Sequence, residues 1–364
     1  MNGGRVYGHS VRRAEAGRTL LSLLTSAYPH ASHDEWCAHI REGRVTVDQA
    51  VAEEDLRLDE GAQVLYHRSP WMEPAAPISD LHILHDDGAL VVLHKPSGLP
   101  VIPSELYYEH TVLQVLKRLR SSEIAPHPTH RLGVGTSGLL LCAIGSKARS
   151  ALSRAFESRA VSKTYLALAS GHIDPRPSDT CEDGCEDGAF VVDCPIGPVP
   201  HCSWAGSVHG ALPEGGEGAK PARSIVRVTA RLASDGTQPA RSLVEVRIPT
   251  GRAHQIRIHM AFLGHPLLGD PLYAPGGRPR AAPAPSDSTS TAAGTPATDA
   301  ETEGRPPLPR DGGYLLHAWR VELPHPVSGE RVSFEAQPPP SLLVQGKSPT
   351  MKRKGAPERI VEPE

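Results

Sequence analysis

The amino-acid sequence predicts an α+β fold, in which a mixed and largely antiparallel sheet carries helices on its faces. Residues 139–144 form an uninterrupted apolar run, which is typical of a strand buried on both faces. Residues 242–248 alternate between polar and apolar side chains, as expected for a half-buried strand. Residues 112–119 and 148–156 place apolar side chains three and four positions apart, which indicates amphipathic helices. The chain of 364 residues is long enough for more than one domain.

Residues 1–72 are expected to form a small N-terminal domain. Ser32 stands directly before a helical pattern, where its hydroxyl can cap the first turn. Turn residues separate the two short strands that follow. The predicted elements are, in order, a basic lead-in over 1–16, helices over 20–27 and 34–41, and strands over 43–48 and 61–66.

Residues 73–340 are expected to form the main domain, joined to the first by a proline-bearing linker. Two insertions interrupt it, near 173–222 and over 275–312. The first is rich in Pro, Gly and acidic residues, and its part 204–222 shows no hydrophobic period. The second is of low complexity and, like the polar tail 341–364, is predicted to be disordered.

Composition limits the classes of function. The formal net charge of −3 does not indicate a nucleic-acid partner, although residues 105–175 hold nine Lys or Arg against five Asp or Glu. The chain begins without an apolar signal segment, and no apolar run is long enough to cross a bilayer. Six cysteines do not make a disulfide scaffold in a chain of this size. A cytoplasmic location is therefore expected.

Four of the cysteines fall in one region, and we tested them for a zinc site. Three, eight and seven residues separate them in turn, and no C-x-x-C pair is present, so we expect no metal site. They are Cys181, Cys185, Cys194 and Cys202.

The most distinctive stretch is HRLGVGTSG at residues 130–138. Its glycines match the G-x-G-x-x-G spacing of dinucleotide-binding loops, but that motif requires a preceding strand and a following helix. Residues 125–129 contain two prolines, and the segment that follows is itself a strand. The context excludes a dinucleotide site.

This stretch resembles the signature of the RluA family of RNA pseudouridine synthases, usually written HRLDxxTSGLLL. The resemblance covers most of residues 80–340 and implies a pseudouridine synthase fold with a central RNA cleft. It also implies that the N-terminal domain is RNA-binding-like. Further motifs match in the family's order: KPSGLP at 95–100, KTYLAL at 163–168, TGRAHQIRIH at 250–259, GDPLY at 269–273 and LHAW at 316–319.

The resemblance also implies the site. Pseudouridine synthases of this family use a carboxylate, an aromatic ring that holds the uracil, and a cation that orients the carboxylate. These demands assign the ring to Tyr165 and the cation to Arg257. Independently of the family, Arg252 stands at a predicted helix start, which favours anions. The residues expected to bind RNA are His130, Arg131, Lys163, Arg252 and His254. No metal or cofactor is required.

Gly133 stands where the family has its catalytic aspartate, and a glycine can neither attack nor accept a proton. Asp86, Asp87 and Asp270 match acids that the family has in addition to its catalytic aspartate. They are therefore poor substitutes for it. Glu105 and Glu109 are freer candidates. If no acid substitutes, Arg257 is expected to lack its partner.

Two functions remain open from the sequence. The first is an RNA pseudouridine synthase that acts as a monomer on ribosomal or transfer RNA, with an acid from another position. The second is a catalytically silent RNA-binding protein on the same scaffold.

Overall fold

The computed structural model describes residues 1–28, 31–104, 106–120, 124–174, 188–201, 204–280, 307–343 and 358–359. The chain divides into two compact units, Met1–Pro74 and Ala75–Glu364. Within the described ranges, no helix combines the length and the apolar character needed to cross a membrane.

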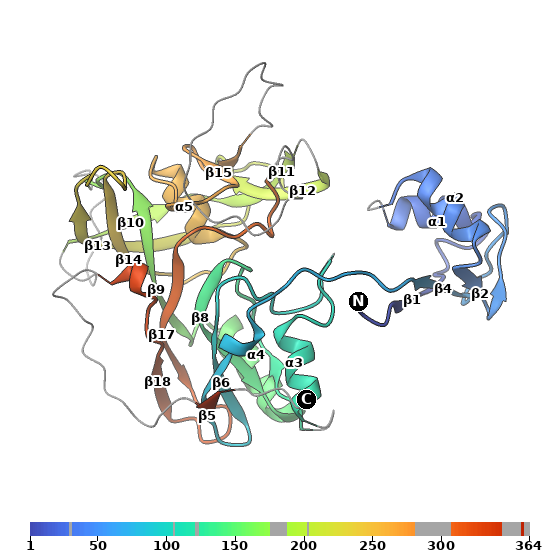
Figure 1. Cartoon of the computed structure of the whole chain (residues 1–364), viewed down its shortest axis with the longest axis horizontal. Coiled ribbons are helices and arrows are strands. Elements are labelled where there is room, and N and C mark those ends of the chain that lie inside the picture. Colours follow the sequence, from blue (N-terminus) through green and yellow to red (C-terminus); the bar gives the residue numbers. More distant parts are fainter. Residues whose placement is uncertain are drawn as a thin grey trace, which may run out of the picture. The chain divides into compact units, whose positions relative to one another are not determined.

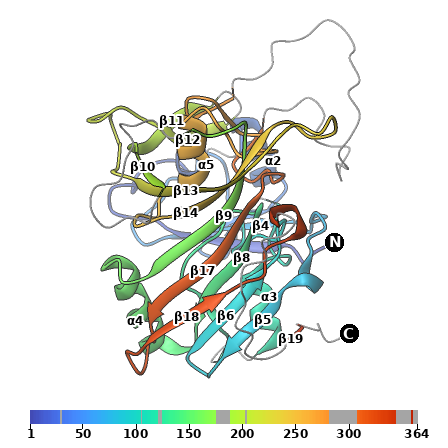
Figure 2. The same ribbon diagram turned by 90° about the vertical axis from the view of Figure 1, so that its left-hand side faces the viewer.

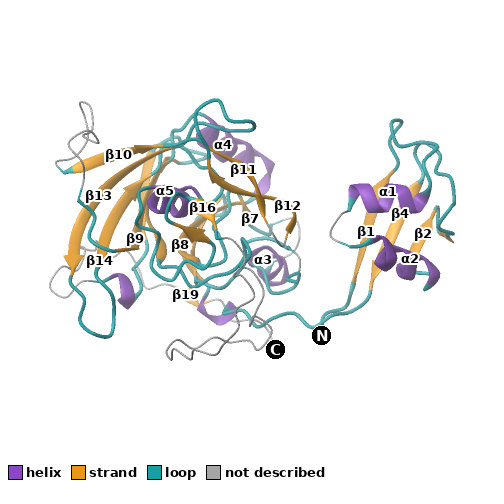
Figure 3. Ribbon diagram, turned by 90° about the horizontal axis from the view of Figure 1, so that it is seen from above, coloured by secondary structure: helices purple, strands orange, loops and turns teal. Residues whose placement is uncertain are grey.

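The N-terminal unit packs two helices against a small sheet (Figure 3). Ser32 caps the second helix as predicted, because its hydroxyl accepts the N–H of Glu35 while the Glu35 carboxylate accepts the N–H of Ser32. Trp36 from that helix and Leu20 from the first are fully buried in the core of the unit. The elements are β1 (Arg5–Ser10), α1 (Leu20–Ala27), α2 (His33–Arg41), β2 (Val45–Val47), β3 (Ala50–Val51) and β4 (Gln63–Arg68), with sheet order β1-β4-β2-β3.

The expectation of a loose lead-in over residues 1–16 is wrong. Strand β1 pairs antiparallel with β4, from Arg5 opposite Arg68 to Ser10 opposite Gln63. Five of its six residues are exposed, so this edge strand shows no hydrophobic alternation in the sequence. The strand forms because it pairs with residues some 60 positions away. The pattern of apolar residues within a short segment cannot predict such a pairing.

The second unit is built on one large sheet (Figures 1 and 2). Its strands pair in the order β10-β13-β14-β9-β17-β8-β6-β5-β19, and β7 and β18 pair with β8 and β17. All pairs are antiparallel except β17 with β8, which confirms the mixed, largely antiparallel α+β fold. The strands of this sheet are β5 (His82–Asp86), β6 (Leu90–Lys95), β7 (His127–Pro128), β8 (Thr136–Ala143), β9 (Ser162–Ser170), β10 (Ala189–Asp193), β13 (Arg223–Leu232), β14 (Arg241–Arg247), β17 (Leu316–Pro324), β18 (Arg331–Glu335) and β19 (Glu358–Arg359).

Strand β8 is the centre of the core, and all eight of its residues are buried, as the apolar run predicted. Helices α3 (Val112–Leu119) and α4 (Gly145–Glu157) add Val115 and Leu152 to the same core. Outside the main sheet lie α5 (Gln255–Phe262) and the strands β11 (Ile196–His201), β12 (Trp204–Ala211), β15 (Tyr273–Ala274) and β16 (Arg278–Pro279).

The expectation that 204–222 lacks regular structure is wrong for its first part. Strand β12 pairs antiparallel with β11 as a two-stranded sheet. Prolines at 198 and 200 in β11 and a glycine at 210 in β12 weaken any β signal in the sequence, because proline has no N–H group to donate and glycine has no side chain to pack. The 275–312 insertion and the tail lie largely outside the described residues.

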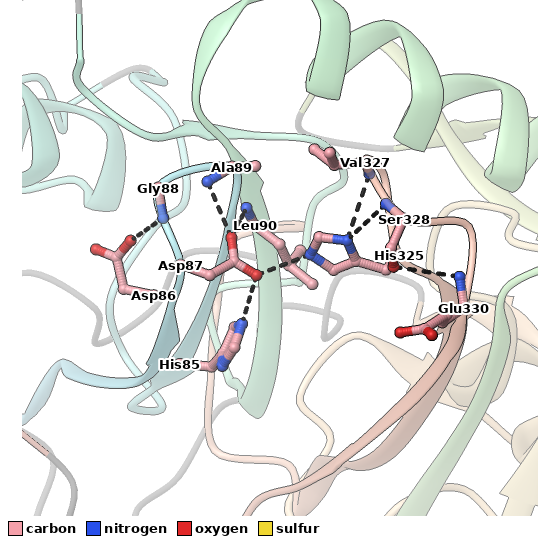
Figure 4. A network of polar contacts seen from close by, with 10 residues as sticks. All are labelled: His85, Asp86, Asp87, Gly88, Ala89, Leu90, His325, Val327, Ser328 and Glu330. Atoms are coloured by element: carbon pink, nitrogen blue, oxygen red, sulfur yellow. Dashed lines mark hydrogen bonds and ion pairs between the residues drawn. The ribbon is translucent and has the colours of Figure 1, made fainter.

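Figure 4 shows a polar network between the turn that follows β5 and the turn that follows β17. The Asp87 carboxylate accepts the N–H groups of Ala89 and Leu90 at 2.9 and 2.8 Å. It also meets Nε2 of His85 at 2.9 Å and Nε2 of His325 at 2.7 Å. Burial alone would raise the pKa of Asp87, but these hydrogen bonds together hold it well below its usual range.

We expect Asp87→Asn to lower the free energy of unfolding by about 1–3 kcal/mol at neutral pH, because hydrogen bonds to a charged acceptor are lost. A carboxyl with a depressed folded-state pKa stabilises the fold above its unfolded pKa of about 4 and loses that contribution as the pH falls. The difference between wild type and variant in urea unfolding should therefore shrink below about pH 4. The exposed Asp80→Asn should change little at any pH. A difference for Asp87→Asn that stays constant with pH would contradict this account.

Candidate functional site

The loop at residues 133–135 is held by the loop that follows β6. The Lys95 ammonium donates to the carbonyl oxygens of Pro96 and Leu99 at 2.8 Å and of Val134 at 3.2 Å. Ser97 Oγ donates to the carbonyl of Gly135 at 2.9 Å. Lys95 is fully buried, and burial lowers its pKa to about 7. No structural role for Lys95 was expected from the sequence, although a lysine followed by a proline at the end of a buried strand was a usable signal for one.

Arg257 and Asp270 form a fully buried, two-pronged ion pair. Arg257 Nε and Nη2 each donate to an Asp270 oxygen at 2.7 Å, and the two side chains are 1% and 0% exposed. Burial would lower the pKa of Arg257, but the hydrogen bonds and charge of Asp270 outweigh it and raise the pKa. The expectation that Arg257 would lack a partner is therefore wrong for these two nitrogens. The third, Nη1, is buried and has no hydrogen-bond partner among the described residues.

Tyr314 fills the space beside Gly133. A Cβ atom added to Gly133 would lie 2.5 Å from Tyr314 Oη. The same hydroxyl lies 3.3 Å from Thr136 Oγ1, and the guanidinium carbon of Arg257 lies 4.0 Å from the centre of the Tyr314 ring. Tyr314 is 3% exposed. The Tyr314 phenol thus occupies the space that a side chain at position 133 would fill. No pattern in the sequence indicated this.

Glycines allow this approach. A Cβ on Gly135 would lie 2.9 Å from the Tyr314 ring and 3.0 Å from Gly312 Cα. A Cβ on Gly269, whose φ is +77°, would overlap the carbonyl oxygen of Gly313. The backbone segments on both sides of the phenol therefore contact each other directly, which fixes the Tyr314 side chain in place.

His130, Lys163 and Tyr165 line a small cavity together with Phe156. His130 Nε2 accepts the N–H of Leu141 at 3.0 Å. Burial, with a smaller effect of the Lys163 charge, lowers the pKa of His130 to about 3, so its ring is neutral at physiological pH. Tyr165 is 7% exposed, and burial raises its pKa.

The remaining predicted RNA contacts lie on two loops. Arg131 is exposed. Arg252 Nε donates to the carbonyl of Pro221 at 3.1 Å, and a Cβ on Gly251 would lie 3.2 Å from Lys163 Nζ, so this turn lies beside Lys163. His254 precedes α5 with a φ of +53°, its Nδ1 lies 2.8 Å from Tyr273 Oη, and burial, chiefly, lowers its pKa to about 3.

The structure therefore brings the predicted residues into two groups. In the first group, Arg257 contacts Asp270 and Tyr314, and the Tyr314 hydroxyl lies beside Gly133. In the second group, His130, Lys163 and Tyr165 line one small cavity. Among the described residues, Arg257 makes its hydrogen bonds with Asp270 and its cation–π contacts with Tyr273 and Tyr314, and Tyr165 is not among these partners.

The candidate acids are placed as follows. Asp270 is the one that contacts Arg257, while Asp87 belongs to the network of Figure 4. Glu109 pairs with Arg118 at 2.9 Å, and Asp86 pairs with Arg120. Glu105 lies outside the described residues.

Among the described residues, no group of three or more His, Cys, Asp or Glu is placed to hold a metal ion. Cys194 is buried with a free thiol. The other three cysteines of the tested zinc pattern fall outside the described ranges.

Comparisons with known proteins agree on one family. The family model described as RNA pseudouridylate synthase matches residues 89–262. "RNA pseudouridine synthase 5" of Oryza sativa subsp. japonica is 36% identical, covering 94% of this chain and 88% of that protein. "Ribosomal large subunit pseudouridine synthase D" of Nitrosomonas europaea is 31% identical over 90% of this chain and 83% of its own length. Among solved structures, human RNA pseudouridylate synthase domain containing 1 is 25% identical with a TM-score of 0.48, covering 74% of this chain and 89% of its own.

Proposed function

Because the chain belongs to the RNA pseudouridine synthase family, we propose that it converts uridine to pseudouridine in RNA. The observation that carries this proposal is the buried Arg257–Asp270 pair, whose guanidinium lies against the ring of Tyr314, the residue that reaches Gly133. A cation held by Asp270, with a further N–H group that has no partner among the described residues, is suited to an acceptor atom of an incoming nucleotide.

The reaction breaks the bond between ribose C1′ and uracil N1, turns the base and joins C1′ to C5. The base must leave its stack to reach a buried cation, and a single-stranded loop allows this at least cost. We assign the stacking ring to Tyr165 and contacts with the RNA chain to His130, Arg131, Lys163, Arg252 and His254. The exposed position of Arg131 and the close approach of the Arg252 turn to Lys163 support these assignments.

We further propose ribosomal or transfer RNA as the substrate and a cytoplasmic monomer as the acting form. The Nitrosomonas europaea relative is named a ribosomal large subunit pseudouridine synthase, which supports ribosomal RNA as the substrate. Three buried free thiols in the described ranges suit a reducing compartment.

Tyr165→Leu removes the proposed stacking ring, whereas Tyr165→Phe keeps it. Stacking of a base on an aromatic ring contributes about 1–3 kcal/mol, so we expect Tyr165→Leu to lower the rate of pseudouridine formation by roughly 10- to 100-fold. Tyr165→Phe should stay within about threefold of wild type. The substrate is RNA from a strain that lacks this gene, and melting temperatures of both variants show whether they are folded. Equal rates for Leu and Phe would exclude the stacking role.

The Gly133–Tyr314 arrangement favours a second candidate, a catalytically silent RNA-binding protein. Neither residue carries a carboxylate, and the Asp270 carboxylate is already bound to Arg257. The test is the double variant Gly133→Asp with Tyr314→Ala, which restores an acid and clears the space for it. RNA binding without product in wild type, together with product from the double variant, would establish the silent scaffold. Product from wild type supports the enzyme.

A further inference from the structure

Tyr314 is the described polar side chain that most closely approaches the place of a side chain at position 133. We propose that Tyr314 is a catalytic residue, whose hydroxyl carries out the proton transfers that a glycine at 133 cannot perform. This inference rests on the proposed function and names the group that makes the reaction possible without an acid at position 133.

The alternative groups at this position are weaker candidates. Asp270 has no exposed side-chain surface, and its two oxygens are already bound to Arg257. Oδ1 also accepts the N–H groups of Leu272 and Tyr273 at 2.9 and 3.1 Å. Thr136 Oγ1, at 3.4 Å from the same Cβ position, is an aliphatic hydroxyl and a weaker acid than a phenol. The phenol is therefore the group best able to give up and regain a proton there.

Arg257 supplies the electrostatic support that such a role needs. Its guanidinium carbon lies 4.0 Å from the centre of the Tyr314 ring, within the range of a cation–π contact. A positive charge in a buried site acts on its neighbours more strongly than it would in water. The Asp270 carboxylate keeps the guanidinium charged and oriented.

Gly133 provides the approach for the substrate. It is half-buried, whereas the Tyr314 side chain beneath it is buried. Because Gly133 has no side chain, a nucleotide placed against this part of the loop could reach Oη across the backbone. Any larger residue at 133 would stand in the position of the hydroxyl.

The chemistry balances with this one group. As the C1′–N1 bond breaks, its electron pair goes to N1, which takes the phenol proton and leaves a phenolate and an oxocarbenium ion at C1′. The base turns, and the C5=C6 electron pair forms the C5–C1′ bond. The phenolate then removes the proton from C5, which restores the C5=C6 bond and the phenol. The net change moves the glycosidic bond from N1 to C5 and one proton from C5 to N1, without a co-reactant.

The test compares wild type with Tyr314→Phe, which removes only the hydroxyl. The assay is single-turnover release of tritium from RNA that is labelled at carbon 5 of uridine. Loss of a general acid–base group costs about 100- to 10,000-fold, and we expect at least a 100-fold lower rate with RNA affinity within about threefold. Tyr273→Phe would remove another buried phenol hydroxyl, one that contacts the carbonyl of His209. That variant also frees Nδ1 of His254, so the control used is Tyr28→Phe, which removes a phenol hydroxyl bonded to Nδ1 of His9 in the N-terminal unit and should keep most of the rate.

Gly133→Ala is a second variant that keeps the hydroxyl but displaces it, and it should also lower the rate by at least 10-fold because the added Cβ would lie 2.5 Å from Oη. A Tyr314→Phe protein that releases tritium at the wild-type rate would overturn this inference and leave the proposed function standing. Absence of product from the wild type would overturn both.

Discussion

Asp270→Ala is expected to lower the free energy of unfolding by about 3–5 kcal/mol, since the variant leaves the Arg257 guanidinium charged and unpaired in the core. The pair is two-pronged at 2.7 Å and has almost no exposed surface. Solvent therefore cannot replace the lost carboxylate. The measurement is urea unfolding at neutral pH, monitored by circular dichroism.

The matched control is Asp193→Ala. Asp193 also accepts two hydrogen bonds from one arginine, Arg223, at 2.9 and 2.7 Å, but both side chains are about half exposed. An exposed pair of this kind contributes about 0–1 kcal/mol. Similar losses for the two variants would mean that burial does not set the strength of the Arg257–Asp270 pair.

Gly138→Ala is expected to destabilise the fold by more than about 4 kcal/mol and to abolish the accumulation of folded protein. Gly138 has a φ of +104° and pairs with Ala318 where β8 and β17 run parallel. A Cβ at this position would overlap the backbone carbonyl oxygen of Ala318. Neither strand can move away, because both lie in the centre of the core.

Gly145→Ala is the control that measures the free-energy cost of a positive φ alone, without a steric overlap. Gly145 also has a positive φ, of +79°, but a Cβ there meets nothing within 4 Å. Only the left-handed backbone penalty of about 1–2 kcal/mol applies. Soluble yield and thermal unfolding of the two variants measure the difference, and equal behaviour would contradict the proposed overlap with Ala318.

Strands β8 and β14 of the large sheet could be predicted because they are buried or half-buried. The apolar run of β8 and the alternation of β14 are local consequences of burial, so they are visible in the sequence. The exposed β1 and the Pro- and Gly-bearing β11–β12 ribbon carry no such pattern. Strand β1 depends on its pairing with the distant β4, whereas β11 and β12 pair with each other as neighbours in the chain.

The candidate site could be predicted only in part. The motifs located Arg257, Tyr165 and the glycine loop, and their catalytic roles remain predictions. The motifs did not reveal the partner of Arg257 or the residue beside Gly133, since Asp270 lies 13 positions after Arg257 and Tyr314 lies 181 positions after Gly133. Such contacts depend on how loops from separate strands meet.

The sequence by itself determined the family, the α+β class and the absence of an acid at position 133, because these depend on residue identity and on periodic burial. The tertiary structure alone decided that Asp270 neutralises Arg257 and that the Tyr314 phenol occupies the space of the missing side chain. The physical reason is close packing. A buried charge must be paired, and a space opened by a glycine is filled by whichever side chain the fold brings next to it.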